Sequence, residues 1–479
     1  MNFIVPDLIA VLPELFVAGM ACLILVVDLF LKQEQRGWTY FLTQVTLVGA
    51  LVITLIGAHD SVRVSFNGTY VSDSLSILIK SVVYIVTAVV FLYSRPYLAE
   101  RGMYRGEYFV LGLFGMLGMM ILISAGSMIT LYLGLELMSL SLYAMVAFNR
   151  DSSQASEAAM KYFVLGAIAS GMLLYGMSML YGLTGTLEIH EINNRLMVGG
   201  DMLNLPMLFG LAFIMAGVAF KLGAVPFHMW LPDVYHGAPT SVTLYLGTAP
   251  KLAAFAMIVR LLVEGLDVAQ GSWRDMFYIL VILSLVAGNV IAIAQTNIKR
   301  MLAYSTISHV AFLMMGFLSG VSSGYAASLF YTIVYALTAL AGFGMIMVLS
   351  RKGFESDQID DFRGLNDRSP WLAFLMLLIM FSMAGVPLTA GFYAKLVVLQ
   401  SVVEADMIGL AIFAVIMSVI GAFYYLRIVK IMYFDKPIDE PVPAQPLDVN
   451  LVLGANGLMV LVFGIMPGVL MTLCIQALS

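Results

Sequence analysis

One glutamate and four lysines lie inside long apolar runs of the sequence: Glu136, Lys161, Lys221, Lys251 and Lys395. Burial disfavours the charged form of an amine, and a neighbouring carboxylate favours it again. A change in the distance between Glu136 and Lys221 could therefore switch that lysine between holding and releasing a proton. Side chains of these types inside apolar segments predict proton transfer.

Two histidines extend this set of titratable groups. His309 and His228 titrate nearer neutrality than lysine does. For His309 alone, a hydrogen-bonded packing role is an equal alternative. With the lysines, a row bridged by water would offer successive proton sites at Lys221, Lys251, His309 and Lys395.

The alternative for these charges is a set of static ion pairs that fix helix packing. One Glu–Lys pair alone fits that interpretation as well as it fits proton transfer. Four lysines against one deep glutamate leave an excess that pairing cannot neutralise, which favours a transfer pathway. Lys161 lies only four residues into its apolar run, so an interfacial position is its alternative.

The composition places these residues in a membrane. Of 479 residues, 61% are hydrophobic and 11% are charged, whereas a soluble domain has about 25% charged residues. The 24 Lys and Arg against 29 Asp and Glu leave no basic surface for nucleic acid. We therefore expect an all-α polytopic membrane protein.

Hydropathy and the Gly, Pro and charge clusters predict about fourteen transmembrane helices. A spanning helix needs about 20 apolar residues. The longest connections, 184–204 and 351–369, are too short for a soluble domain, so 1–479 is predicted to be a single membrane domain. The predicted spans lie near 8–31, 40–58, 73–93, 108–124, 127–148, 157–183, 205–228, 240–262, 275–294, 300–318, 323–350, 370–401, 407–433 and 449–475.

An internal repeat organises these spans. Four short stretches recur in the same order at offsets of 161 to 170 residues. They predict a first five-helix repeat at 108–262 and a second at 275–433, with flanking helices at 1–93 and 449–479. Because five is an odd number of spans, the second repeat must be inverted in the membrane.

The seventh and twelfth spans are predicted to be broken helices. Each contains a similar tetrapeptide that ends in proline, at Pro226 and Pro387. Proline removes a backbone hydrogen bond, and broken backbone is tolerated in a membrane only where protein or a water-filled cavity covers it. A simple proline kink is the alternative. The charges do not repeat, since Glu136 aligns with Ser305.

Charge in the connections predicts the orientation. The positive-inside rule places both termini outside the cytoplasm, because thirteen basic residues lie in one set of connections and three in the other. Lys80 and Arg260 are expected to reach the outer interface. The thirteen are Lys32, Arg36, Arg95, Arg101, Arg105, Arg150, Lys299, Arg300, Arg351, Lys352, Arg363, Arg368 and Lys436, and the three are Arg63, Arg195 and Arg274.

Motifs for redox chemistry or hydrolysis are absent from the sequence. It has two cysteines, whereas an iron–sulfur cluster takes about four. It has no Walker A sequence, no dinucleotide fingerprint after a strand and no metal-ligand spacing. We therefore expect no cofactor and no metal in this chain, and energy from an ion gradient or from a partner.

Three stretches resemble a known family. These are 220–240 (FKLGAVPFHMWLPDVYHGAPT), the GLELMSL sequence around Glu136, and 295–309. They are similar to the antiporter-like membrane subunits of respiratory complex I, and the similarity covers essentially the whole chain. The PDVYHGAP wording at 232–239 looks like one sister subunit more than the other two.

The resemblance implies site residues. In this family a glutamate of the fifth span pairs with a lysine of the seventh, which match Glu136 and Lys221. The lysine of the eighth span matches Lys251, and a lysine or glutamate of the twelfth matches Lys395. Lys161 matches a lysine that is less general among the sisters.

The resemblance also implies a function. It indicates a proton-translocating subunit of NADH:quinone oxidoreductase in the bacterial inner membrane, with periplasmic termini. FMN, iron–sulfur clusters and quinone would belong to partner subunits, and the partners would be a sister antiporter-like subunit and small membrane subunits in the lipid bilayer. The alternatives are a subunit of a multi-subunit monovalent cation/proton antiporter and a purely structural membrane scaffold.

Overall fold

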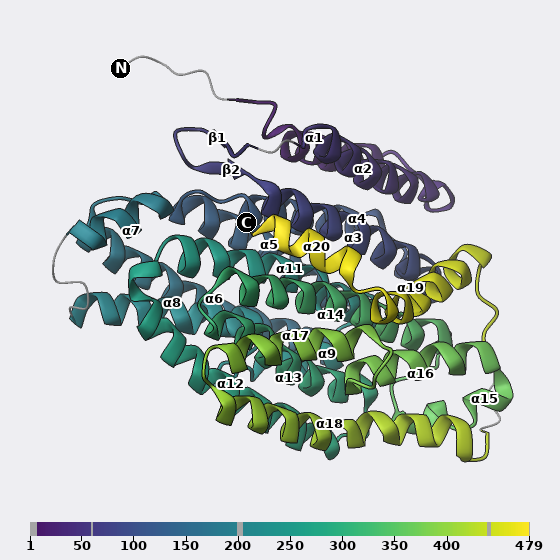
Figure 1. Ribbon diagram of the computed structural model, residues 1–479. Helices are drawn as coiled ribbons and strands as arrows, with labels where there is room; N and C mark the ends of the chain where they lie inside the picture. Colours follow the sequence, from purple (N-terminus) through teal and green to yellow (C-terminus); the bar gives the residue numbers. More distant parts are fainter. Residues whose placement is uncertain (1–6, 59–60, 199–204, 438–441, 479) are drawn as a thin grey trace.

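A computed structural model describes residues 7–58, 61–198, 205–437 and 442–478 as a bundle of helices (Figure 1). One short antiparallel hairpin pairs β1 (Arg63–Ser65) with β2 (Tyr70–Ser72). The helices are α1 (Leu12–Asp28), α2 (Gly37–Ile56), α3 (Ser74–Glu100), α4 (Gly106–Ile123), α5 (Met128–Val146), α6 (Ser153–Thr184), α7 (Ile189–Val198), α8 (Leu205–Leu222), α9 (Trp230–Gly237), α10 (Thr240–Leu246), α11 (Ala249–Ile258), α12 (Gln270–Ile293), α13 (Ile298–Leu318), α14 (Ser322–Leu349), α15 (Leu365–Arg368), α16 (Pro370–Ala384), α17 (Ala390–Glu404), α18 (Ile408–Phe434), α19 (Leu447–Ile465) and α20 (Gly468–Ala477).

The predicted class, an all-α membrane protein, is confirmed. Within the described residues, twelve helical segments are long and apolar enough to cross a membrane, and α16 and α20 are shorter apolar helices. In the most apolar stretch of α14, 94% of the residues are buried, whereas in the corresponding stretch of α6 or α18 the share is 33%. The centre of the bundle therefore lies around α10, α11, α13 and α14, and the outer helices offer apolar surface to lipid.

Two helices end in the middle of predicted spans. The α8 helix ends at Leu222, followed by Gly223 with φ +83°, and α16 ends at Ala384, followed by Gly385 with φ +87°. The amide of Gly223 donates to Ala219 O at 2.9 Å, and that of Gly385 donates to Phe381 O at 2.9 Å. Glycine adopts positive φ without steric cost, so it is the glycine, not the following proline, that ends each helix.

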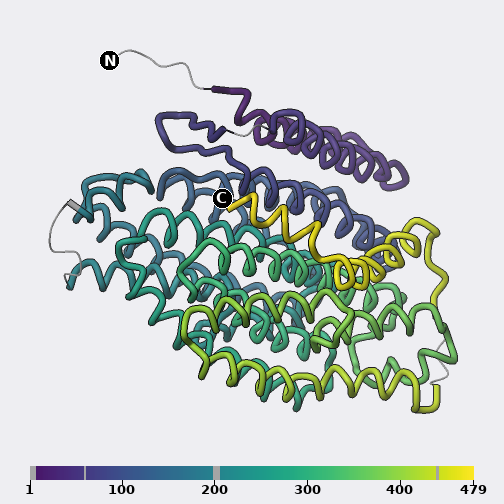
Figure 2. Tube along the Cα trace, in the orientation of Figure 1, coloured from purple at the N-terminus to yellow at the C-terminus, as the bar shows by residue number. Residues whose placement is uncertain are grey.

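The hairpin of α1 and α2 lies to one side of the bundle, next to α3 (Figure 2). Lys80 of α3 is buried here, with its amine 2.5 Å from Glu14 of α1 and 2.9 Å from the hydroxyl of Tyr70. The expectation that Lys80 reaches the outer interface is therefore wrong. Its carboxylate partner comes from a helix about sixty residues away in the sequence.

Arg260 also differs from its expected position. It is 1% exposed, and its guanidinium lies 2.8 Å from Asp73 and 2.6 Å from Glu264. Burial raises the pKa of Asp73, but the Arg260 charge and the hydrogen bonds from Ser76 outweigh it, so the pKa lies below its usual value. Lys80 and Arg260 thus form static pairs that join helices.

Replacing Lys80 with alanine should destabilise the protein. Removing one partner of a buried ion pair leaves the other charge uncompensated, at a cost of about 3–5 kcal/mol. Thermal unfolding of the purified chain in detergent would measure the loss. The double variant Lys80→Met/Glu14→Gln should recover most of it, because neither charge then remains.

Lys430→Ala is the matched control for this experiment. Its amine lies 2.9 Å from Asp435, but the lysine side chain is 65% exposed, so little stability should be lost. Equal unfolding temperatures for Lys80→Ala and Lys430→Ala would contradict a stabilising role of the buried pair.

Candidate functional site

The structure places five of the sequence-predicted titratable residues on five different helices. Glu136 lies on α5, Lys221 in the last turn of α8, Lys251 in the first turn of α11, His309 in the middle of α13 and Lys395 on α17. Four of these side chains line two small polar cavities, and Lys251 lies at the break after α8.

The first cavity holds the predicted Glu136–Lys221 pair. It measures about 20 Å³, which is room for about one water molecule, and Ser139 and Ser170 also line it. The amine of Lys221 donates to the Ser139 hydroxyl at 3.0 Å, and the Ser170 hydroxyl donates to the Glu136 carboxylate. The two charged groups therefore share one cavity, each held by its own serine.

Lys251 binds the end of the interrupted helix. Its amine donates to the carbonyl oxygen of Leu222, the last residue of α8, at 2.6 Å, and the side chain is 2% exposed. The last carbonyl groups of a helix have no partner within it and carry partial negative charge. The last carbonyl groups of α8 therefore favour the charged, ammonium form of Lys251, which burial disfavours.

Lys395 makes the same arrangement at the second break. Its amine donates to Met383 O at 3.1 Å and to Ala384 O at 3.0 Å, at the end of α16. The aliphatic part of Lys395 packs over Gly385, where a β-carbon would lie 3.0 Å from its Cδ atom. At both interrupted helices, the last carbonyl groups thus accept hydrogen bonds from a lysine that lies on a later helix.

His309 has a tyrosine hydroxyl within hydrogen-bond distance of each ring nitrogen. Its Nδ1 lies 2.6 Å from the hydroxyl of Tyr331, and its Nε2 lies 3.1 Å from that of Tyr425, which also bonds to Ser305. His309 and Lys395 line a second cavity of about 10 Å³. A hydroxyl both donates and accepts, so this cluster can pass a proton without moving a helix.

Sequence reasoning missed several of these polar residues. Asn289 of α12 is 2% exposed, donates to Ser308 at 2.9 Å and accepts from the hydroxyl of Tyr424 at 3.1 Å. Ser139 and Ser170 hold the first pair. Their only signal in the sequence is a small polar residue within an apolar run, which a packing residue produces as well.

Two predicted residues lie outside these cavities. Lys161 is exposed and forms ion pairs with Glu157 at 2.9 Å and with Asp233 at 2.7 Å. It lines a separate cavity of about 130 Å³ together with Asp233 and His236. His228 lies in the segment between α8 and α9 and is partly exposed.

The described residues contain no group of three or more His, Cys, Asp or Glu side chains that could hold a metal ion. The polar groups around the two cavities and the break after α8 are proton donors and acceptors: amines, one carboxylate, one imidazole and a set of hydroxyls. Such groups can hold and pass protons between neighbouring positions.

Comparison with known proteins identifies the family. A family model described as NADH:quinone oxidoreductase/Mrp antiporter, TM, matches residues 125–421. NADH-quinone oxidoreductase subunit N of Thioalkalivibrio sulfidiphilus is 66% identical over 479 residues, 100% of this chain and 100% of that one. The name of this relative favours the oxidoreductase over the antiporter alternative.

Two solved structures share the fold. A chain of respiratory complex I from Thermus thermophilus with bound aureothin has a TM-score of 0.83 and 29% identity, and the match covers 96% of this chain and 98% of that chain. A chain of the Mrp complex from Dietzia sp. DQ12-45-1b has a TM-score of 0.87 over 98% of this chain and 97% of that chain, and at 20% identity it shows the fold alone.

The family resemblance is therefore confirmed; it was inferred from 220–240, 295–309 and the surroundings of Glu136. The PDVYHGAP sequence at 232–239 indicates the same sister subunit as the name of the bacterial relative. The chain belongs to the NADH:quinone oxidoreductase/Mrp antiporter family of transmembrane proteins.

Proposed function

We propose that this chain is a proton-translocating membrane subunit of NADH:quinone oxidoreductase, which couples quinone reduction in partner subunits to proton transfer across the membrane. The observation that carries the proposal is the pair of lysines, the buried Lys251 and the partly buried Lys395, each bonded to the end of an interrupted helix. The 66% identity to a bacterial subunit N over its full length supports the reaction that drives it.

The first step assigns a switch to Glu136 and Lys221. Each is held by its own serine around one cavity, so a small helix movement can bring the carboxylate closer to the amine or take it away. A closer carboxylate favours the ammonium form, and a more distant one favours release of the proton. Conformational change driven from a partner subunit would thereby load and unload Lys221.

The proton then moves along the row. Lys251 binds Leu222 O, next in sequence to Lys221, and His309 shares a cavity with Lys395. Tyrosine hydroxyls on both ring nitrogens of His309 let it accept a proton on one side and give it up on the other. Lys161 and His228 are proposed as further proton-transfer residues outside the two cavities.

The architecture proposed with this function has fourteen spans. Two inverted five-helix repeats, 108–262 and 275–433, carry the site, and 1–93 and 449–479 flank them. The matching glycine-terminated breaks after α8 and α16 support the repeat. Inverted repeats with breaks at corresponding positions are the layout of many transporters.

The proposed orientation follows the charge bias. Connections with thirteen basic residues face the cytoplasm, and both termini face the periplasm of a bacterial inner membrane. Met1 and Ser479 themselves lie outside the described residues. FMN, iron–sulfur clusters and quinone are assigned to partner subunits, which include a sister antiporter-like subunit and small membrane subunits.

Alanine at Glu136, Lys221, Lys251 or Lys395 should abolish most proton transfer. A positioned proton-transfer group contributes about 10²–10⁴ in rate, so proton uptake by the assembled complex in vesicles should fall at least about tenfold, with coupled NADH oxidation falling alongside. Proton uptake and NADH oxidation are measured in the same membranes.

The exposed Lys430→Ala is the control and should leave both rates unchanged. Undiminished proton uptake in Lys221→Ala, Lys251→Ala and Lys395→Ala would refute the role of these lysines in proton transfer and would favour the alternative of a purely structural scaffold. Sodium- or potassium-driven proton exchange that needs no NADH would favour the antiporter alternative.

Gly385→Ala should impair proton transfer through Lys395. A side chain at φ +87° costs about 1–2 kcal/mol, and the new β-carbon would lie 3.0 Å from Cδ and 3.4 Å from Nζ of Lys395. The lysine must shift from the carbonyl oxygens of α16. Coupled proton uptake per assembled complex should therefore fall several-fold.

Gly409→Ala is the matched control, because no other atom lies within 4 Å of its added β-carbon and its φ is not positive. Equal proton uptake by the two variants would contradict the proposed role in proton transfer of Lys395 at the second break.

A further inference from the structure

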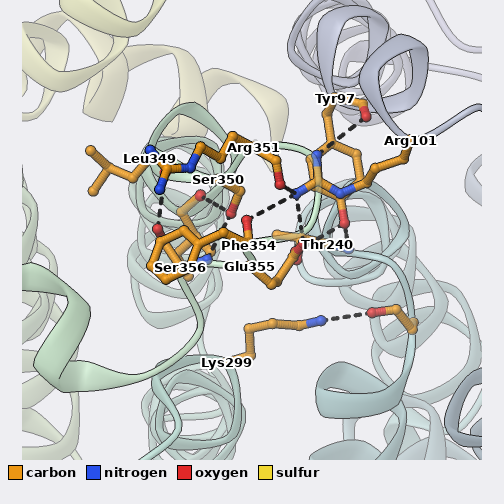
Figure 3. A network of polar contacts seen from close by, with 12 residues as sticks. Tyr97, Arg101, Thr240, Lys299, Leu349, Ser350, Arg351, Phe354, Glu355 and Ser356 are labelled. Atoms are coloured by element: carbon orange, nitrogen blue, oxygen red, sulfur yellow. Dashed lines mark hydrogen bonds and ion pairs between the residues drawn. The ribbon is translucent and has the colours of Figure 1, made fainter. Parts of the chain in front are cut away.

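Glu355 lies in the connection after α14, where the ends of several helices meet (Figure 3). Its carboxylate accepts from the Thr240 hydroxyl at 2.5 Å and from the Tyr97 hydroxyl at 2.9 Å. It also accepts from Nη2 of Arg101 at 2.8 Å. One carboxylate thus joins the end of α3 to the first residue of α10.

These contacts take the place of a missing helix cap. Pro239 precedes α10 and makes no side-chain cap, so the first amides of this helix need other partners. The amide of Thr240 donates to the Tyr97 hydroxyl at 3.2 Å, which in turn donates to Glu355. A negative charge at a helix N-terminus also interacts favourably with the helix dipole.

The same connection holds the start of α13. The amide of Ile298 donates to Asp357 O at 2.7 Å, and the side chain of Asn297 donates to the Asp357 carboxylate at 2.8 Å. Lys299 of α13 donates to Ala238 O at 2.7 Å, two residues before α10. The segment that carries Glu355 therefore ties the starts of α10 and α13 to each other.

The charge of Glu355 persists in this partly buried position, where its side chain is 29% exposed. Burial raises its pKa, but Lys299, Arg101 and the hydroxyls of Thr240 and Tyr97 outweigh that effect, so the pKa lies below the usual carboxyl value. Since the pKa is lowered, the side chain is ionised at neutral pH, and its contribution to stability is lost only as the pH falls through that lowered pKa.

Each tied start leads to a residue of the proton row: α13 carries His309, and α11, which follows α10 after Gly247 and Thr248, carries Lys251. Thr240 stands eleven residues before Lys251, and Lys299 stands ten residues before His309. Lys251 and His309 are consecutive in the proposed pathway. Their separation depends on how α10 and the α11 helix that follows it are placed along α13, and proton transfer is sensitive to displacements of about 1 Å.

We propose that Glu355 is a positioning residue for proton transfer: it fixes the start of α10 to the connection whose Asp357 binds the start of α13, and it thereby keeps Lys251 and His309 at the separation that transfer requires. Glu355 acts through the helices and not by contact with either residue. The inference rests on the proposed function, and it extends the functional residues to a connection outside the apolar spans.

The test uses the full complex in membrane vesicles with Glu355→Gln, Glu355→Asp and the control Asp360→Asn. Asp360 is a carboxylate in the same connection whose side chain is 71% exposed. Glu355→Gln should lower coupled proton uptake per assembled complex roughly tenfold, the effect of losing charge-assisted hydrogen bonds. Glu355→Asp should restore part of it, and Asp360→Asn should match the unaltered protein.

A merely structural role gives a different result. It would lower the amount of assembled complex and leave proton uptake per complex, and protons per NADH oxidised, unchanged; that outcome overturns the proposal. If Glu355→Gln fails to assemble, Thr240→Val and Tyr97→Phe carry the test, because each removes one donor to the carboxylate. Both should lower uptake per complex several-fold, and wild-type uptake in both overturns the proposal.

A double variant adds a second readout. Because Tyr97 acts through Glu355, Tyr97→Phe should add little to the loss in Glu355→Gln, whereas independent effects would multiply and overturn the proposal. Lys251→Ala in the same membranes separates the two proposals. If Lys251→Ala impairs uptake and Glu355→Gln does not, the positioning role alone fails; if Lys251→Ala has no effect, the proposed function fails.

Discussion

A helix that ends inside a membrane must find partners for its last carbonyl groups, because no water is available there to bind them. In this protein the amines of Lys251 and Lys395 bind those groups at the ends of α8 and α16. A lysine amine still has N–H groups after it loses its proton, so the hydrogen bond survives both charge states while the attraction to the helix end changes. The same constraint that breaks the helices thus provides groups that can titrate without leaving an unpaired backbone.

The contacts separate two kinds of intramembrane charge. Lys80 and Arg260 bind carboxylates directly, at 2.5 to 2.8 Å, and join helices. The amines of Lys221 and Lys251 instead bind a hydroxyl and a backbone carbonyl. A direct ion pair strongly favours one charge state, whereas a neutral partner leaves the charge free to respond to a group such as Glu136 that can move. Under the proposed function, this difference, more than depth alone, distinguishes the packing charges from the proton-transfer charges.

The sequence predicted an all-α membrane protein and located the isolated lysines because apolar length and isolated charges are local properties. It could not predict the partners of Lys80 and Arg260, since Glu14 and Asp73 come from distant segments and only packing brings them close. It attributed the breaks to Pro226 and Pro387, but the helices end at Gly223 and Gly385, where positive φ is needed. The serine and tyrosine partners of the site were missed for the same reason, because a hydroxyl in an apolar run gives no sign of which side chain it meets.

The two halves of the site are not equivalent. The first cavity contains the carboxylate of Glu136, whereas the aligned position in the second half is Ser305, bonded to Tyr425 beside His309. Among the described residues that line the second cavity, none is a carboxylate. Under the proposed function, a movable negative charge can therefore drive loading only at Lys221, while Lys395 responds to the protonation of His309 next to it.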